Sequence, residues 1–195
     1  MRFSIITIIA AIAMAALYSC EDMATYDEKP QISFSKVYIA DTLDALQNKI
    51  KLQRVHLEVI DGDGNVGLNR NDTTGPYHPD SLWYNNLFVK IYNKEANGSY
   101  RELSDLSEKM KYRIPFKEPI GQNKYMKAEV IVKIEIPLEF INYDTIRYEF
   151  FIYDRDLQKS EIEESCDIPI RQHGTIWADG HTSLVKEPGD NQQQQ

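Results

Sequence analysis

Residues 127–136 alternate between apolar and polar side chains almost without a break, and no other feature of the chain constrains its fold more. Every even position from Ala128 to Ile136 is apolar, whereas four of the five odd positions carry a charge. A period of two sends successive side chains to opposite faces, which is typical of a β-strand with one buried and one solvated face. Residues 144–154 repeat the pattern. The sequence therefore predicts two half-buried strands, joined through residues 139–143 by a hairpin-type connection.

Shorter alternations predict the remaining strands. Four further segments have strand-like apolar patterns: residues 55–59, 87–91, 112–116 and 161–170. The strand predicted over residues 31–39 changes phase midway, which indicates a β-bulge near Ser35 and Lys36. Only residues 105–111 and 41–47 are compatible with a helical turn. Seven short strands with no useful helix between them predict an all-β fold, an antiparallel β-sandwich.

The N-terminus has the pattern of an export signal. Arg2 precedes an apolar run that is too short to span a bilayer and ends in Leu17-Tyr18-Ser19-Cys20. This ending resembles the lipobox of bacterial lipoproteins, although Tyr18 is larger than the usual residue. The resemblance implies that residues 1–19 are cleaved and that Cys20 is lipidated. An ordinary secretory signal, in which Cys20 has no role, is the alternative.

Charge and cysteine content narrow the function classes. Removal of residues 1–19 leaves 176 residues with 21 Lys and Arg against 30 Asp and Glu, a net charge of −9. Such an acidic balance argues against nucleic-acid binding and against electrostatic adhesion to anionic lipid, so membrane attachment would come from the acyl chains. Cys166 then has no partner for a disulfide, and its phase with Ile168 and Ile170 predicts a buried core residue.

The folded domain is expected over residues 31–172. Residues 20–30 are polar and acidic and are interpreted as a tether, and residues 173–195 as a C-terminal tail whose end is disordered. Glu21 and Asp22, directly after Cys20, resemble the acidic export signals of Bacteroidota surface lipoproteins. A solvated linker explains the same two residues equally well.

The segment DGDGNVGL at residues 61–68 is the clearest candidate for a site. Asp61, Asp63 and Asn65 place oxygen-bearing side chains at alternate positions, as a hard cation such as calcium requires, and Asp72 is twelfth in the count from Asp61. The segment departs from an EF-hand because Val66 occupies the position of the obligatory glycine. The competing interpretation is a tight turn in which Gly and Asn supply positive φ angles.

The same segment carries a wider resemblance. VIDGDGNVGL, then LFVKIYNK, then DTIRYEFFIYDRDLQKSE resemble a group of Bacteroidota lipoproteins with a DGDGD(I/L)G turn and a terminal DRAGHKSN-like hairpin. The resemblance covers roughly residues 30–170 and implies an immunoglobulin-like sandwich without an assigned activity. This chain departs from the group at Asn65, which weakens the cation hypothesis, and at residues 156–158.

Two further sets of residues are candidate modification or binding sites. Asp-Thr or Asp-Ser triplets at residues 41–43, 72–74, 80–82 and 144–146 resemble the O-glycosylation signal of Bacteroidota exported proteins. Thr42, Thr73 and Ser81 lie in predicted loops and are therefore the candidate acceptors. The loop of residues 75–86 gathers candidate ligand-binding rings that can stack on sugars or fill a partner's pocket, or simply cap the open end of the sandwich: Tyr77, Trp83 and Tyr84.

No catalytic motif is recognisable in the chain. The expected function is therefore a non-catalytic binding or accessory subunit of an outer-membrane assembly. The expected location is the outer membrane, facing the cell surface or the periplasm. A carbohydrate-binding surface module is the alternative, and a hydrolase with unrecognised carboxylates is a second. The expected partners are the membrane, through the lipid anchor, and an envelope protein, with glycan as a further possibility. No cofactor other than calcium is expected.

Overall fold

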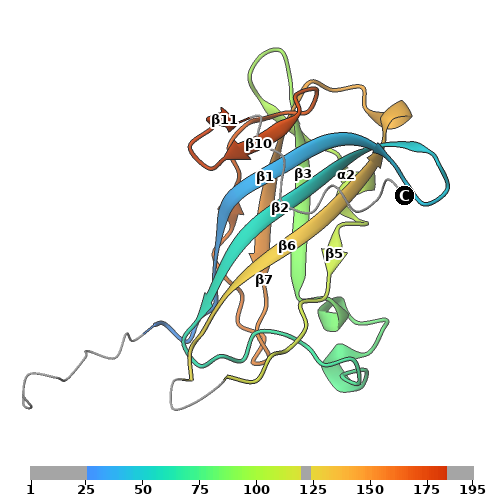
Figure 1. The fold of residues 1–195 in the computed structure, drawn as a ribbon. Coiled ribbons are helices and arrows are strands. Elements are labelled where there is room, and N and C mark those ends of the chain that lie inside the picture. Colours follow the sequence, from blue (N-terminus) through green and yellow to red (C-terminus); the bar gives the residue numbers. More distant parts are fainter. Residues whose placement is uncertain (1–25, 120–123, 184–195) are drawn as a thin grey trace, which may run out of the picture.

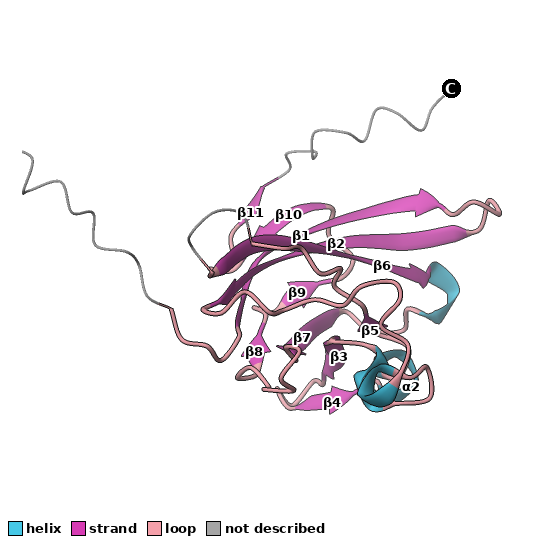
Figure 2. Ribbon diagram, turned by 90° about the horizontal axis from the view of Figure 1, so that it is seen from below, coloured by secondary structure: helices cyan, strands magenta, loops and turns pink. Residues whose placement is uncertain are grey.

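The computed structural model describes residues 26–119 and 124–183, which form two antiparallel β-sheets packed face to face (Figures 1 and 2). The first sheet has the strand order β11-β10-β1-β2-β6. Its strands are β1 (Gln31–Leu43), β2 (Lys49–Asp61), β6 (Met126–Pro137), β10 (Gly174–Trp177) and β11 (Thr182–Ser183). The all-β sandwich predicted from the alternating segments is confirmed.

The second sheet has the order β4-β3-β7-β8, with β5 also paired to β3 and β9 also paired to β7. Its strands are β3 (Leu87–Lys94), β4 (Tyr100–Glu102), β5 (Lys111–Tyr112), β7 (Thr145–Ile152), β8 (Glu163–Glu164) and β9 (Ile168–Pro169). The helices are short: η1 (Gly75–Tyr77), η2 (Leu82–Tyr84), α2 (Ser104–Ser107) and η3 (Leu138–Phe140). None of the described helices is long and apolar enough to cross a bilayer.

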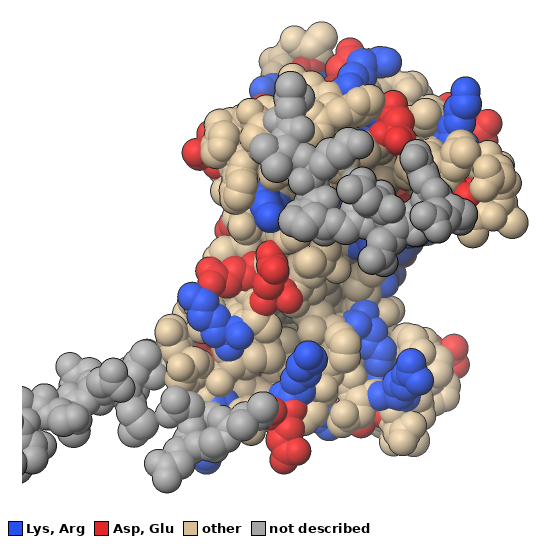
Figure 3. Space-filling model, in the orientation of Figure 1, with Lys and Arg blue, Asp and Glu red and all other residues tan. Residues whose placement is uncertain are grey.

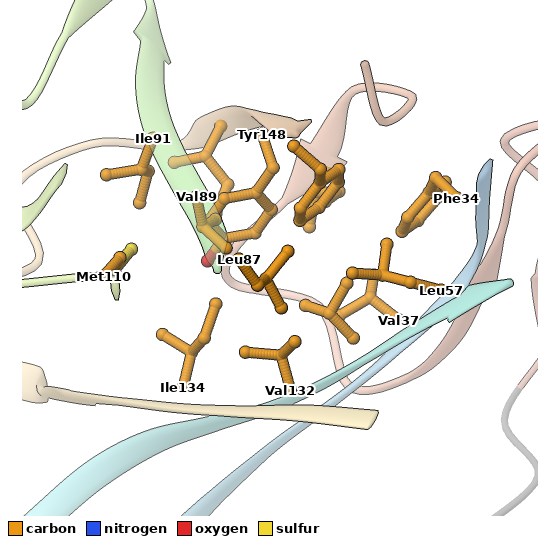
Figure 4. Packing of buried hydrophobic residues seen from close by; sticks show 14 of the residues in the cluster. Phe34, Val37, Leu57, Leu87, Val89, Ile91, Met110, Val132, Ile134 and Tyr148 are labelled. Carbon is orange, nitrogen blue, oxygen red and sulfur yellow. The ribbon is translucent and has the colours of Figure 1, made fainter. Parts of the chain in front are cut away.

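The hydrophobic core lies between the two sheets and is filled from both (Figure 4). Phe34, Leu57 and Val132 come from the first sheet and meet Val89 and Tyr148 of the second. Tyr148 is fully buried, and its hydroxyl donates a hydrogen bond to Gln53 Oε1 at 3.0 Å across the core, whereas Gln53 Nε2 has no partner among the described residues. The period-two pattern holds along both predicted strands, since even positions of β7 and the second half of β6 are buried.

The connection between β6 and β7 differs from the prediction. Both strands have their apolar face toward the same core, but they belong to different sheets, so residues 138–144 cross from one layer to the other and include η3. A hairpin was therefore the wrong expectation. A short connection between two half-buried strands is compatible with either geometry, and alternation alone does not distinguish them.

Strand lengths also differ from the prediction. β1 and β2 form a hairpin of 13 residues on each side, so the segment predicted over residues 55–59 is the middle of a much longer strand. Residues 41–43, the first part of the candidate helical turn at residues 41–47, instead continue β1. The predicted bulge is confirmed, because the β1–β2 register shifts between Phe34 and Lys36. The predicted last strand, 161–170, is divided into β8 and β9.

The sandwich extends past residue 172, where the sequence suggested that the domain ends. β10 pairs with β1 and buries Ile176, so it completes one edge of the first sheet. The Cys166 thiol donates to the carbonyl of Trp177 at 3.3 Å and packs against the core while remaining half-buried. Residues 1–25 and 184–195, including the predicted lipidation site Cys20 and the end of the tail, lie outside the described residues.

The sandwich has two ends, the tether end and the hairpin end, each made of loops that join the strands. The tether end contains residues 26–30, where the chain enters β1, together with the loops of residues 62–86, 113–119 and 153–162. The hairpin end contains the β1–β2 turn of residues 44–48, the loop of residues 95–99, and η3. In Figure 1 the tether end lies at the bottom and the hairpin end at the top.

Candidate functional site

The predicted site at residues 61–68 lies at the tether end and begins with the last residue of β2. Gly62 donates its N–H to the carbonyl of Asp27 at 2.9 Å, and a Cβ on Gly62 would lie 2.4 Å from the carbonyl oxygen of Tyr26. Gly64 has a φ of 70°, and a Cβ there would lie 2.1 Å from the carbonyl oxygen of Lys124. Both glycines permit close backbone approach, and Gly64 also supplies a positive φ angle, so the loop joins three segments of the chain.

Two buried carboxyl groups lie at this end of the fold. Asp61 is fully buried; its Oδ2 accepts a hydrogen bond from Val66 N at 2.9 Å, and its Oδ1 has no hydrogen-bond partner among the described residues. Asp154 follows β7 and is equally buried; its Oδ1 accepts from Gln158 N at 2.7 Å, and its Oδ2 is likewise without a partner in the described chain. Such buried oxygens are costly to leave unsatisfied.

The electrostatic consequence is a raised pKa for both groups. Burial raises the pKa of Asp61 to about 6, and the negative charges of Asp63 and Asp154 contribute in the same direction. Burial also raises the pKa of Asp154, with contributions from Asp156 and Asp63. Desolvation and like charge both disfavour the ionised form, so this pair binds protons more tightly than exposed carboxyl groups do.

Asn65 links the DGDGN loop to the turn after β7. Its Nδ2 donates to Asp63 Oδ2 at 2.7 Å and to Asp156 Oδ2 at 2.9 Å. Its Oδ1 accepts from Arg155 N at 3.4 Å. The Asn65 amide group therefore lies between two carboxylates and donates to both. Its oxygen already accepts from Arg155 N, so it is not free to bind a cation.

Asp72 is held apart from this group. Its Oδ2 accepts from Asn69 N at 2.7 Å and forms an ion pair with Arg155 Nη1 at 3.2 Å. The structure thus brings Asp61, Asp63 and Asn65 together with the residues that follow β7 and pairs Asp72 with a cation. Among the described residues, no group of three or more His, Cys, Asp or Glu side chains is arranged to hold a metal ion. Calcium binding stays a prediction.

Asp154 and Asp156 were not singled out from the sequence. Their signal was present, since both follow a strongly alternating strand. Two carboxyl groups after a strand indicate a site only when it is known that the end of β7 meets the end of β2 at the same end of the sandwich. That juxtaposition follows from the three-dimensional arrangement and not from spacing along the chain.

The aromatic side chains of residues 75–86 pack against the chain itself. The Tyr77 hydroxyl donates to the carbonyl of Arg155 at 2.7 Å, and burial raises its pKa. The Arg113 guanidinium lies 4.7 Å from the ring centroid of Tyr84 and donates to the Tyr84 carbonyl at 2.5 Å. Trp83 is half-buried, with its indole nitrogen inside. These contacts match the interpretation in which the rings cap the open end of the sandwich.

The three candidate glycosylation residues have different environments. Thr42 was expected in a loop but lies within β1, opposite Ile50 of β2, and is half-buried. Thr73 lies in an exposed loop. Ser81 caps η2, because its Oγ accepts from Trp83 N at 3.3 Å. Thr73 is therefore the most accessible of the three.

A shallow pocket of about 370 Å³ lies at the tether end, between residues 27–33 and 161–163. An ion pair between Lys29 and Glu161 crosses it, and Glu163 Oε1 accepts a hydrogen bond from Phe34 N at 2.9 Å. These charged groups fasten β1 and the segment before it to β8 and the segment before it. Comparison of this chain with protein families, curated proteins and solved structures finds no match.

Proposed function

We propose that this chain is a lipid-anchored, non-catalytic binding or accessory subunit of an outer-membrane assembly, and that it contacts a protein partner through the hairpin end. The observation that carries the proposal is the exposure of large apolar side chains there. Leu46 in the β1–β2 turn is 81% exposed, and Phe140 in η3 is 62% exposed. Leu43, at the end of β1, is also exposed. The two most exposed large apolar side chains of the described residues, Leu46 and Phe140, thus share one end of the domain, which favours a docking surface there.

The turn that carries Leu46 is ordered by its own residues. Asp44 Oδ1 accepts hydrogen bonds from Leu46 N at 2.8 Å and from Asn48 N at 2.9 Å, while its Oδ2 accepts from Asn48 Nδ2 at 3.0 Å. Because the backbone is fixed before any partner arrives, little conformational entropy is lost when Leu46 is buried in an interface.

The segment before β1 supports attachment at the opposite end. Besides the Gly62–Asp27 hydrogen bond and the Lys29–Glu161 ion pair, the ring of Tyr26 lies 4.9 Å from that of Tyr125. From Cys20 to Tyr26 the chain can reach at most about 20 Å. A lipid on Cys20 would therefore hold the tether end close to the bilayer. Basic and acidic side chains are mixed on the face seen in Figure 3, so no single-signed patch there competes with lipid anchoring.

The experiment compares two double variants in native membranes. Leu46→Asp with Phe140→Asp places charges at the hairpin end, and Leu82→Asp with Ile162→Asp is the control, because Leu82 and Ile162 are 55% and 53% exposed at the tether end. After crosslinking and purification, the wild type and the control should retain the same envelope protein, and the hairpin-end variant should lose it. A solitary lipoprotein in all three samples would overturn the proposal.

Anchoring is tested separately. Mass spectrometry of the mature chain should find acyl groups on residue 20, and Cys20→Ser should move the protein from the membrane to the soluble fraction. An unmodified Cys20, or a variant that stays with the membrane after salt washing, would remove the lipid anchor from the proposal without affecting the docking surface.

A further inference from the structure

The free edge of the first sheet is unusually long. β6 spans 12 residues and, within the described chain, pairs only with β2. The opposite edge is β11, which has two residues. An edge strand carries a row of backbone N–H and C=O groups without ladder partners, and it can add another strand. Which strand β6 accepts is indicated by its side chains.

The outward face of β6 has a distinctive order of side chains. Lys127, Glu129, Ile131, Lys133 and Glu135 all point away from the core and are exposed. Read along the strand, the order is positive, negative, apolar, positive, negative. Ile131, at the centre, is 53% exposed although it lies in the middle of a regular strand.

This order is complementary to itself when reversed. If a second β6 lies antiparallel with Ile131 opposite Ile131, Glu129 of each copy faces Lys133 of the other. In the same register, Lys127 faces Glu135. Every charged position then meets an opposite charge, and the exposed isoleucines meet each other. Directly opposite residues in an antiparallel pair are close enough for such side chains to interact.

Neighbouring registers lack this property. Centring the pair on Val130 places Lys127 opposite Lys133, and centring it on Val132 places Glu129 opposite Glu135. A register shifted by a single residue turns the apolar face of one strand toward solvent. The register centred on Ile131 is therefore favoured over its neighbours. In this register odd positions meet odd positions and even positions meet even positions, so backbone hydrogen bonds can form whichever of the two sets points its N–H groups toward the second copy.

The inner face of β6 agrees with the same pairing. Val132, Ile134 and Ile136 are buried, whereas Ala128 and Val130 remain half-exposed. In the register centred on Ile131, Val130 of one copy lies opposite Val132 of the other, and Ala128 lies opposite Ile134. The half-exposed part of each strand would thus be covered by the second copy.

We propose that two copies of this chain associate through antiparallel pairing of β6 with β6, with Ile131 on the two-fold axis. Each of the four charged side chains also has a polar partner within its own chain, and the contacts across the axis would be shared with these partners. Glu129 Oε1 lies 2.7 Å from His56 Nδ1. Lys127–Glu58, at 2.8 Å, and Lys133–Glu135, at 2.5 Å, lie on the solvent-exposed face. The pairing joins the first sheets of both copies into one continuous sheet. It leaves the β1–β2 turn open, since β2 lies between β6 and β1. Because β6 runs from the tether end to the hairpin end, the tether ends of the two copies lie at opposite ends of the joined sheet. Pairing of this kind and the anchoring of both copies in one bilayer therefore exclude each other.

Cysteine crosslinking tests the register directly. In full-length protein carrying Cys20→Ser and Cys166→Ser, Ile131→Cys should form disulfide-linked dimers under mild oxidation, because opposite Cβ atoms on the axis are close. Ile162→Cys, at a site of the same 53% exposure, is the control and should stay monomeric. Mixed Glu129→Cys and Lys133→Cys chains should crosslink with each other more than either does with itself. Linkage no greater for residue 131 than for residue 162 would overturn the proposal.

Charge reversal tests the complementarity without a covalent bond. Lys133→Glu turns two attractive pairs into two repulsive ones in the dimer, and we expect the dissociation constant to rise roughly tenfold or more in sedimentation equilibrium. Adding Glu129→Lys to Lys133→Glu restores opposite charges, so the double variant should dimerise again. A monomeric wild type, or a double variant no better than Lys133→Glu alone, contradicts the pairing. An unchanged thermal transition confirms that each variant folds.

Discussion

At the tether end, glycines and buried carboxyl groups join segments far apart in the sequence, whereas at the hairpin end each turn is held by its own residues. Asn65 connects to Asp156, and Gly64 lies against Lys124. At the hairpin end, Asp44 holds residues 46 and 48, and Asn97 Oδ1 accepts from Ser99 N at 2.9 Å. The tether end therefore depends on the whole fold, and the hairpin end can change without disturbing it.

A pair of glycine variants should break this comparison most sharply. Gly64→Ala would bring a methyl group 2.1 Å from the carbonyl oxygen of Lys124, and relief of that clash requires backbone movement. We expect a loss of more than about 3 kcal/mol in the free energy of unfolding. Gly98→Ala at the hairpin end is the control. Its φ of 86° is also positive, but the space around it is open, so the loss should be about 1–2 kcal/mol.

Urea denaturation measures both glycine variants under the same conditions. Equal losses would mean that the segment containing Lys124 moves aside freely, and the tether end would then not be the interlocked region described above.

The buried Asp61 should make stability depend on pH. Its pKa is raised from 3.8 to about 6, so the native state holds its proton more tightly than the unfolded state does. Stability from this group is present below about pH 4 and is lost as the pH rises through 6, by up to about 3 kcal/mol. Asp61→Asn should remove that dependence, because an amide does not titrate in this range. The variant should still fold, because the amide oxygen can accept from Val66 N.

The measurement is the difference in unfolding free energy between wild type and Asp61→Asn at pH 4.5 and pH 7. The variant should gain on the wild type as the pH rises. A difference that is the same at both values would show that the Asp61 carboxyl is not protonated preferentially in the native state.

Calcium offers a second test of the same carboxyl groups, because a bound cation favours their ionised forms whereas burial favours the protonated forms. A cation bound to Asp61 and its neighbours would stabilise the ionised forms and raise the melting temperature at neutral pH. At one hundred times the dissociation constant the gain would be about 2.7 kcal/mol. Asp61→Asn and Asp154→Asn should each abolish it, and magnesium serves as the control ion. No shift with millimolar calcium would leave turn chemistry as the sole role of the DGDGN loop.

The comparison also separates what the sequence can and cannot predict. Alternation over residues 127–136 and 144–154 predicted β6 and β7, and a phase change predicted the bulge near Ser35 and Lys36, because these signals are local. The crossing between sheets at residues 138–144 was missed. So was the influence of the Asp154 charge on the pKa of Asp61, since it joins residues 93 positions apart through the packing of two sheets. Local patterns do not encode which strand ends meet.

Leu46→Ser should have the smallest effect on stability, and it tests whether the hairpin end can change without disturbing the fold. Leu46 is 81% exposed, so its removal from the folded chain loses little buried area, and we expect a change within about 0.5 kcal/mol. Thermal and urea unfolding measure it against Leu57→Ser, where a fully buried side chain is replaced. If Leu46→Ser were as harmful as the core variant, the apolar side chain would serve folding. If it is neutral, folding does not account for a leucine on a rigid exposed turn, and recognition becomes the better explanation.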